Sequence, residues 1–442
     1  MSINGSAQIP LLDLPSQRSK PGIFLRATQA EKTSCSFVNN MGLPVHRWFR
    51  YSAGFSAAWV RQVLKEEYLR GKRTVIDPFV GSGTVLLEAE ANGYTAIGVE
   101  SHPFVSRIAK AKMLWRENPL HLAKVARSVL QKARTIRTDV SKYCALVQKC
   151  FSHEFLSKLD ALRCTYESER TDDPVFELVW LAITSILRNC SHVGTAQWQY
   201  ILPRKTKAKV LEPLEAFLNK IDLLCNDMTV QQSFCKGPRP NLYTTDIRNC
   251  PEIPENWADL LITSPPYANN YDYADATRLE LSFWGEVESW GDLHNKIRKH
   301  LIVSCTQHAA TLRAEWKQLI KDPLLGPITD EIDRACTLLN NEKHKHGGKK
   351  QYDAMIASYF HDLARTWHVL RKIMRRDSRV CFVIGDSAPY GVYVPVHEWL
   401  GKLALAAGFR SYSFEKIRDR NTKWKNRKHR VPLNEGRLWV QG

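Results

Sequence analysis

The sequence contains no run of about 18 uncharged apolar residues, the length expected of a helix that spans a membrane. Its first 22 residues are polar and include proline, and they lack the apolar stretch of a signal peptide. There is also no internal repeat and no low-complexity tract. These absences predict a chain without a membrane partner and with a cytoplasmic location.

Metal-binding patterns are missing as well. The chain has 11 cysteines but no CxxC pair and no closely spaced cluster of cysteine and histidine. An odd number of scattered cysteines is typical of reduced, mostly buried thiols rather than of a disulfide framework or a zinc site. We therefore expect no metal.

Acidic residues are fewer than basic ones, 45 against 63, so the formal net charge is +18. Lysine and arginine that face phosphates gain affinity by releasing counterions, and such an excess therefore suggests a polyanionic partner. Basic surfaces also occur on proteins that bind no nucleic acid, so charge alone does not decide. Hydrophobic residues make up 44% of the chain, enough for a large core.

The patterns that are present predict half of a doubly wound α/β sheet near the N-terminus. A short apolar strand, Thr74–Asp77, runs into a glycine-containing loop and then a helix, Thr84–Asn92. A second strand follows at Tyr94–Glu100 and a second helix at His102–Trp115.

The rest of the sheet is expected further along the chain. Its predicted strands and helices are Asp259–Thr263, Tyr352–Arg375 (an amphipathic helix), Val380–Ile384, Val394–Ala407 (a helix), Ser411–Ile417 and Leu438–Gln441. Between them lie two inserts of mainly helical character. The predicted division is 1–35 as a flexible lead-in, 36–117 as the first half of the sheet domain, 118–240 as a helical insert, 241–285 as the second half, 286–350 as a helical insert with a basic flap, and 351–442 as the remainder with a basic loop.

The glycine loop is the first motif that indicates chemistry. Gly81 and Gly83 permit a tight turn and a close approach of backbone to a ligand, and the helix N-terminus behind them favours a carboxylate or phosphate. Glu100 follows Gly83 by 17 residues and ends the next strand, where a carboxylate can accept hydrogen bonds from both ribose hydroxyls. The pattern predicts a nucleoside-containing cofactor without distinguishing NAD from S-adenosylmethionine.

The second motif, Ser264-Pro265-Pro266-Tyr267, follows a predicted strand at its carboxyl end, where ligands bind in such sheets. Two prolines remove two backbone donors and leave carbonyl acceptors free. A base amino group needs acceptors for its hydrogens before nitrogen can direct its lone pair at a methyl group, and an aromatic ring can stack on an everted base. The alternative is a plain turn that ends the strand, with Tyr267 packed on the core.

Together the two motifs resemble those of the S-adenosylmethionine-dependent DNA amino-methyltransferases. Asp77–Gly83 resembles the family's cofactor loop. Ser264–Tyr267 resembles its catalytic tetrapeptide, which is SPPY most often in cytosine-N4 enzymes and DPPY or NPPY more often in adenine-N6 enzymes. The stretch 46–56 is similar to the segment that lines the methionine end of the cofactor. Asp246 resembles the acid that contacts the cofactor's adenine, and Asp386 resembles a polar residue at the target-base pocket.

The resemblance implies a Rossmann-like methyltransferase sheet, doubly wound and mostly parallel, with largely helical inserts, of which 118–240 is the candidate target-recognition region. It implies S-adenosyl-L-methionine as cofactor. The implied cofactor-binding residues are Asp77, Pro78, Phe79, Gly81, Gly83, Thr84, Glu100, Asp246, Phe55 and Ser56, and the implied catalytic residues are Ser264, Pro265, Pro266 and Tyr267.

The expected activity is site-specific methylation of cytosine N4 in duplex DNA by base flipping. Adenine-N6 methylation, amino-methylation of RNA of the guanine-N2 type, and an inactive nucleic-acid-binding protein of the same fold remain alternatives. The chain has no Pro-Cys dipeptide, the usual nucleophile signature of cytosine-C5 enzymes. It also has no endonuclease signature, so any restriction activity is expected on a separate cognate endonuclease.

Two basic segments are candidates for contact with DNA. Eight of the fifteen residues from Lys416 to Arg430 are basic, with an aromatic among them, which suits phosphate contact plus stacking. The predicted contacts are Lys423, Trp424, Lys425, Arg427, Lys428 and Arg430, together with Gln197 and Gln199, whose amides suit base edges. A solvated loop is the alternative for both segments. The run His344–Lys350 is the weakest candidate.

Overall fold

A central seven-stranded sheet organises the protein, and its strand order is β5-β2-β1-β6-β7-β9-β8. The computed structural model describes residues 37–51, 53–195, 200–235, 237–249, 252–311, 315–420 and 431–442. The strands are β1 Thr74–Asp77, β2 Thr95–Val99, β5 Asn241–Tyr243, β6 Ala258–Thr263, β7 Met374–Gly385, β8 Ser411–Arg420 and β9 Leu433–Gln441.

The sheet is mostly parallel. β5, β2, β1, β6 and β7 pair in parallel, whereas β9 is antiparallel to both of its neighbours, β7 and β8. Strands such as β6, in which every residue is buried, are apolar on both faces because helices cover both sides of the sheet. This arrangement confirms the Rossmann-like methyltransferase sheet expected from the sequence.

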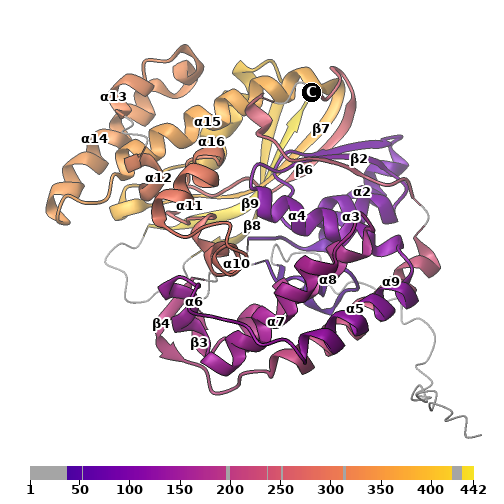
Figure 1. Ribbon diagram of the computed structural model, residues 1–442. Helices are drawn as coiled ribbons and strands as arrows, with labels where there is room; N and C mark the ends of the chain where they lie inside the picture. The colour runs from indigo at the N-terminus through magenta and orange to yellow at the C-terminus, as the bar shows by residue number, and fades with distance from the viewer. Residues whose placement is uncertain are drawn as a thin grey trace, which may run out of the picture.

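Helices pack on both faces (Figure 1). α2 (Ala57–Leu69) and α3 (Thr84–Ala91) share a core with Val75, Leu260 and other side chains of one sheet face. On the opposite face, α15 (Tyr352–Ile373) and α16 (Val396–Ala406) cover the alternate residues, among them Ile76 and Leu261. Successive strand residues point to opposite faces, which is why neighbouring residues in β1 belong to different cores.

The first insert forms a helical lobe with a core of its own, shown at the bottom of Figure 1. Its elements are α5 Pro119–Ala133, α6 Ala145–Cys150, α7 His153–Glu169, α8 Val175–Cys190, the strands β3 Val193–Thr195 and β4 Ile201–Thr206, and α9 Pro213–Phe234. α4 (Pro103–Lys112) joins this lobe to the sheet domain, because Phe104 and Ile108 pack in the lobe and Ala109 packs in the sheet core.

The second insert is also helical and packs beside α15. Its elements are α11 Trp290–Lys296, α12 Thr306–Thr311, α13 Trp316–Leu319 and α14 Thr329–Lys345, and α10 Arg278–Phe283 precedes them. None of the helices in the described ranges is long and apolar enough to cross a membrane.

The predicted strands and helices listed above are all found, most of them within a few residues of their expected bounds. β7 begins at Met374 rather than at Val380, and β9 begins at Leu433 rather than at Leu438. β5 and the β3–β4 hairpin were not predicted, since strands of three residues leave no periodicity to detect. β8 continues past the predicted end at Ile417 to Arg420, so Arg418 and Arg420 of the basic segment lie in a strand. Pairing with β9 keeps these two residues in the sheet.

Gly98 in β2 gives a test of how the sheet supports the glycine loop. A Cβ atom at this position would lie 2.4 Å from Cγ2 of Val80 and 2.8 Å from Cδ1 of Leu86. We expect Gly98→Ala to lower the free energy of unfolding by about 1–3 kcal/mol, the usual cost of overpacking. Gly42→Ala is the control, because no atom lies within 4 Å of its added Cβ. Equal denaturation midpoints for the two variants would contradict the prediction.

Candidate active site

One cavity lies at the carboxyl ends of β1, β2 and β6, and residues of both motifs line it, although Asp77, Gly83, Pro265 and Tyr267 are not among the described lining residues. Its free volume is about 630 Å³, including space open to solvent. The lining residues come from the glycine loop, the end of β2, the tetrapeptide and three further segments: Tyr51, Ala53, Gly54, Phe55, Phe79, Val80, Gly81, Ser82, Thr84, Glu100, Ser101, His102, Ser264, Pro266, Tyr273, Leu301 and Ile302. Two turns that are far apart in sequence therefore meet.

The glycine loop adopts conformations that its glycines make possible. Gly81 and Gly83 have φ values of 53° and 92°, in the left-handed region that favours glycine. Gly83 stands immediately before α3, so the free N–H groups of that helix begin at the loop. A side chain at Gly81 would place its Cβ 3.1 Å from the ring of Tyr51, so glycine is needed here to keep the loop close to the cavity wall.

Asp77 joins the two motifs. Its Oδ1 accepts hydrogen bonds from Thr263 Oγ1 at 2.6 Å and from the Phe79 N–H at 3.0 Å. Within the described ranges, Asp77 Oδ2 and Ser82 Oγ are buried and have no hydrogen-bond partner. Burial raises the pKa of Asp77 to about 7. The loop after β1 thus holds polar atoms that a ligand could satisfy.

Within the described ranges, backbone N–H groups are the hydrogen-bond donors to Glu100. Its Oε2 accepts from the Gly81 N–H at 2.7 Å and its Oε1 accepts from the His102 N–H at 2.9 Å. Burial raises the pKa of Glu100 to about 7, against the effect of these hydrogen bonds. Each oxygen keeps a lone pair for a further donor, so the carboxylate suits a pair of ligand hydroxyls.

The tetrapeptide lies opposite the glycine loop. The Ser264 hydroxyl donates to the carbonyl of Val383 at 3.1 Å. The Tyr267 N–H donates to Tyr273 Oη at 3.2 Å, and the guanidinium of Arg420 lies 5.2 Å from the centre of the Tyr267 ring. Pro265 is buried. Hydrogen bonds from two other segments therefore set the position of the turn.

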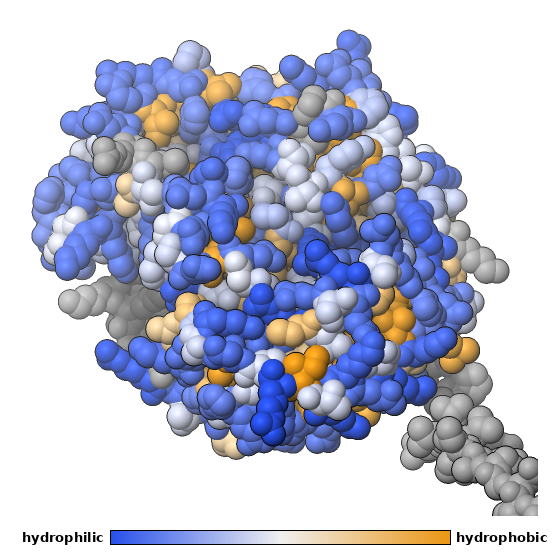
Figure 2. All heavy atoms as spheres, viewed as in Figure 1, coloured by the Kyte–Doolittle hydropathy of each residue, from blue (hydrophilic) through white to orange (hydrophobic). Residues whose placement is uncertain are grey.

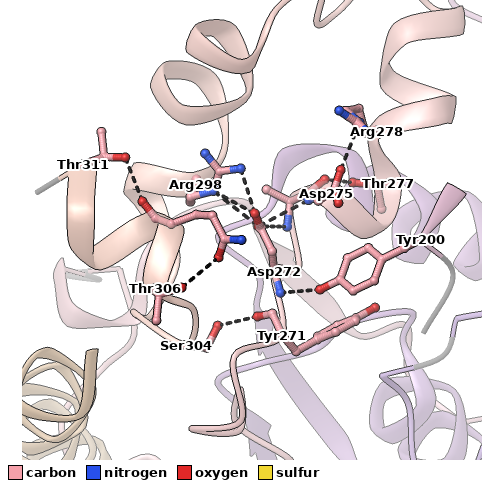
Figure 3. Close-up of polar contacts among 12 residues, drawn as sticks. Tyr200, Tyr271, Asp272, Asp275, Thr277, Arg278, Arg298, Ser304, Thr306 and Thr311 are labelled. Carbon is pink, nitrogen blue, oxygen red and sulfur yellow. Dashed lines mark hydrogen bonds and ion pairs between the residues drawn. The ribbon is translucent and has the colours of Figure 1, made fainter. Parts of the chain in front are cut away.

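The chain that follows the tetrapeptide is fixed by a buried ion pair (Figure 3). Arg298 Nη2 lies 2.7 Å from Asp272 Oδ2, and both side chains are buried. The Asp272 N–H donates to Tyr200 Oη at 2.6 Å, and Ser304 Oγ donates to the carbonyl of Tyr271 at 3.0 Å. Both helical inserts consequently brace the same loop.

Other predicted site residues lie elsewhere. Ser56 begins α2 by accepting a hydrogen bond from the Trp59 N–H and does not line the cavity. Pro78 is buried in the turn after β1. Both oxygens of Asp246 accept from Arg248, and Asp246 is not among the described lining residues, so its predicted contact with a cofactor stays a prediction.

Asp386 connects neighbouring segments through hydrogen bonds and is not among the described residues that line the cavity. Its carboxylate accepts from Tyr393 Oη at 2.9 Å, lies 2.9 Å from His397 Nδ1 and accepts from the Asn434 side chain at 3.1 Å. The predicted DNA contacts Lys423, Trp424, Lys425, Arg427, Lys428, Arg430, Gln197 and Gln199 lie outside the described residues.

Sequence reasoning did not single out several lining residues. Tyr51 stands in the stretch 46–56, and His102 follows Glu100 by two positions, so proximity to a motif could have indicated both. Tyr273 likewise follows the tetrapeptide closely. Leu301 and Ile302 come from the second insert, and no sequence signal pointed to them.

The described part of the chain contains no group of three or more His, Cys, Asp or Glu side chains that could hold a metal ion. The cysteines in it are free thiols, and none lines the cavity. Burial raises the pKa of several of them, including Cys150 to about 11, which disfavours a reactive thiolate.

Comparison with known proteins gives consistent matches. A family model described as DNA methylase, of the N6/N4 type, matches residues 24–111. The chain is 26% identical over 403 residues to the type II methyltransferase M.AvaI of Nostoc sp., covering 85% of this chain and 81% of the relative. It is 26% identical over 428 residues to the type II methyltransferase M.BsoBI of Geobacillus stearothermophilus, covering 87% and 82%. No solved structure matches the chain.

The pKa of Glu100 gives a prediction about ligand affinity. If Glu100 binds the cofactor ribose as the sequence predicts, the ionised carboxylate would accept from both hydroxyls, and protonation at a pKa of about 7 would remove an acceptor. The Kd of S-adenosylmethionine measured by calorimetry should therefore rise by about tenfold from pH 8 to pH 6. Glu100→Gln should bind weakly at every pH in this window and lose the dependence.

Glu286→Gln is the matched control, because burial raises the pKa of Glu286 as well and Glu286 is not among the described residues that line the cavity. This variant should keep the pH dependence of the wild type. The assignment of the pH dependence to Glu100 is wrong if the Kd of Glu100→Gln still changes with pH as it does in the wild type.

Proposed function

Because this chain belongs to the family of S-adenosylmethionine-dependent DNA amino-methyltransferases, we propose that it methylates the exocyclic N4 of cytosine in duplex DNA. The observation that carries this proposal is that Glu100, Gly81 and Ser264 line a single cavity. A ligand bound by the glycine loop would lie beside the tetrapeptide, which is the juxtaposition that methyl transfer to a base requires.

The first side of the cavity fits S-adenosylmethionine. Glu100 presents a carboxylate for the ribose, and the N-terminus of α3 begins at Gly83. Asp77 Oδ2 and Ser82 Oγ are buried polar atoms that lack partners within the described ranges, and a polar ligand nearby would offset their desolvation. When bound, the cofactor would supply an electrophilic methyl group: its bond to sulfur would break as the bond to the base nitrogen forms, and that nitrogen would then lose one proton to solvent.

The tetrapeptide supplies acceptors for the base amino group. The hydroxyl hydrogen of Ser264 is directed at the Val383 carbonyl, so the lone pairs of its oxygen remain for an amino hydrogen. The Pro265 carbonyl is a second acceptor, and neither proline has an N–H to compete. Holding both amino hydrogens turns the nitrogen lone pair out of conjugation with the ring.

We propose that Tyr267 receives the everted base. Tyr273 fixes its backbone N–H, and Arg420 stands over its ring. A base that leaves the duplex gains stacking on such a ring, which offsets part of the cost of unstacking. Direct displacement needs no covalent intermediate, and this agrees with the absence of cysteine among the described lining residues.

The two predicted DNA-contacting segments are continuous in sequence with described residues that contact the tetrapeptide or the loop after it. Arg420, which faces Tyr267, directly precedes the segment with Lys423, Trp424 and the other basic residues. Tyr200, which holds the loop after the tetrapeptide, directly follows Gln197 and Gln199. We propose that both segments contact duplex DNA around the everted base, and that any associated restriction activity resides on a separate endonuclease.

The prediction that cytosine is the target base depends on Ser264, and identification of the methylated base tests it. Single-molecule sequencing of DNA from cells that express the wild type should detect one modified motif, and Tyr267→Ala should give none. Nucleoside mass spectrometry should find N4-methylcytosine. Modified adenine would overturn the base assignment but not the enzyme class, and modification of transfer RNA without modification of DNA would overturn the DNA proposal.

Ser264→Ala tests the acceptor role. Loss of one aligned hydrogen-bond partner in the transition state should lower the single-turnover rate by about 10²-fold. The Kd for S-adenosylmethionine should change by less than about threefold, since Glu100 and the glycine loop are untouched. Gly291→Ala, in the second insert, is a control outside the cavity. An unchanged rate for Ser264→Ala would exclude its hydroxyl from the mechanism.

A further inference from the structure

The turn between α14 and α15 carries a concentration of exposed positive charge. Its lysines are Lys343, Lys345, Lys349 and Lys350, and the last three are exposed. Glu342 is the one acidic residue among 342–350, and it pairs with Lys345 at 2.6 Å. In Figure 2 the surface over α14, at the left of the view, is predominantly hydrophilic. The turn therefore presents more positive charge than its own acid can neutralise.

Aromatic contacts hold this turn against the rest of the protein. The ring of His346 stacks on Tyr390 with ring centres 4.4 Å apart, and Tyr352 meets Tyr390 edge-on at 4.8 Å. Gly347 and Gly348 adopt positive φ, and the Gly348 N–H donates to the carbonyl of Lys343 at 2.9 Å, which closes the turn. A turn held in this way loses less conformational entropy on binding than a free loop of lysines would.

The contact through Tyr390 places the turn at the cavity edge of the sheet. Tyr390 belongs to the 3-10 turn Pro389–Gly391, which follows the carboxyl end of β7. In the same connection, Ser387 Oγ donates to the carbonyl of Ala268, directly after the tetrapeptide. The carbonyl of Asp386 accepts from Arg420, the residue that faces the Tyr267 ring. The basic turn and the tetrapeptide thus attach to one connecting segment.

We propose that the basic turn 343–350 binds the phosphate backbone of the duplex that delivers the target base. This inference rests on the proposed function and extends it to a surface outside the cavity. Lysine ammonium groups suit phosphate oxygens, so the contribution of the turn should be electrostatic and independent of sequence. His346 and Tyr390 position the turn, and the lysines make the contacts.

The test is the salt dependence of DNA binding by the full chain with S-adenosylmethionine present. A triple variant, Lys345→Ala, Lys349→Ala and Lys350→Ala, should flatten the plot of log K against log salt by about 0.9 for each lost phosphate contact, so by about 2 to 3 in all. Cognate and non-cognate duplexes should weaken by the same factor. The Kd for S-adenosylmethionine should not change.

The control removes the same charge from the opposite edge of the sheet. Lys65, Lys372 and Arg376 are exposed, and the last two lie where α15 leads into the start of β7. Changing these three residues to alanine should leave the salt slope within about 0.5 of the wild type. An equal change in both triple variants would mean that only net charge matters and would overturn the inference.

Tyr390→Ala provides a second measurement that leaves every lysine in place. It removes the ring on which His346 stacks, and we expect it to weaken DNA binding several-fold with a smaller change in slope than the triple variant. A wild-type slope in the lysine variant refutes the inference while leaving methylation intact. A wild type that binds no duplex at all refutes the proposed function instead.

Discussion

The hydrogen bond from Thr263 to Asp77 joins the two strands whose ends lead into the glycine loop and the tetrapeptide. Asp77 ends β1 and Thr263 ends β6, and these strands are neighbours in the sheet. Because both partners are buried, the bond exchanges little with water and holds the glycine loop and the tetrapeptide in register. The cavity between the two turns exists because their strands are parallel and begin their loops at the same edge.

Near that bond lie two acidic side chains whose burial disfavours the ionised form. Asp77 and Glu100 are both buried, and burial raises the pKa of each to about 7. Backbone N–H groups stabilise Glu100 only in part, so it retains capacity for donors from a ligand. Acids with raised pKa values, glycines with positive φ and buried polar atoms without partners in the described ranges all cost stability. Their concentration at one site is typical of a ligand-binding site.

The inserts are integral to the site. Tyr200 from the helical lobe and Arg298 from the second insert both bind the loop after the tetrapeptide, and Leu301 and Ile302 complete the cavity wall. Arg248 bonds to Asp246 and to Asp362 and so ties the β5 connection to α15. The lobe is thereby linked to the loop after the tetrapeptide by the hydrogen bond between Asp272 and Tyr200.

The sequence by itself determined the strands β1, β2 and β6, the glycine loop, the tetrapeptide and the class of cofactor. These features depend on local patterns: apolar runs, glycines at a turn and paired prolines. It also determined the amphipathic helix α15, whose stripe repeats every three to four residues.

Only the tertiary structure decided which residues share the cavity. Tyr273, Leu301 and Ile302 reach it, whereas Asp246 pairs with Arg248 and Asp386 pairs with His397. The tertiary structure also decided that residues 343–350 stack on the connection after β7. Such placements depend on strand order and on contacts between segments more than a hundred residues apart, as between Asp77 and Thr263, and no local pattern encodes them.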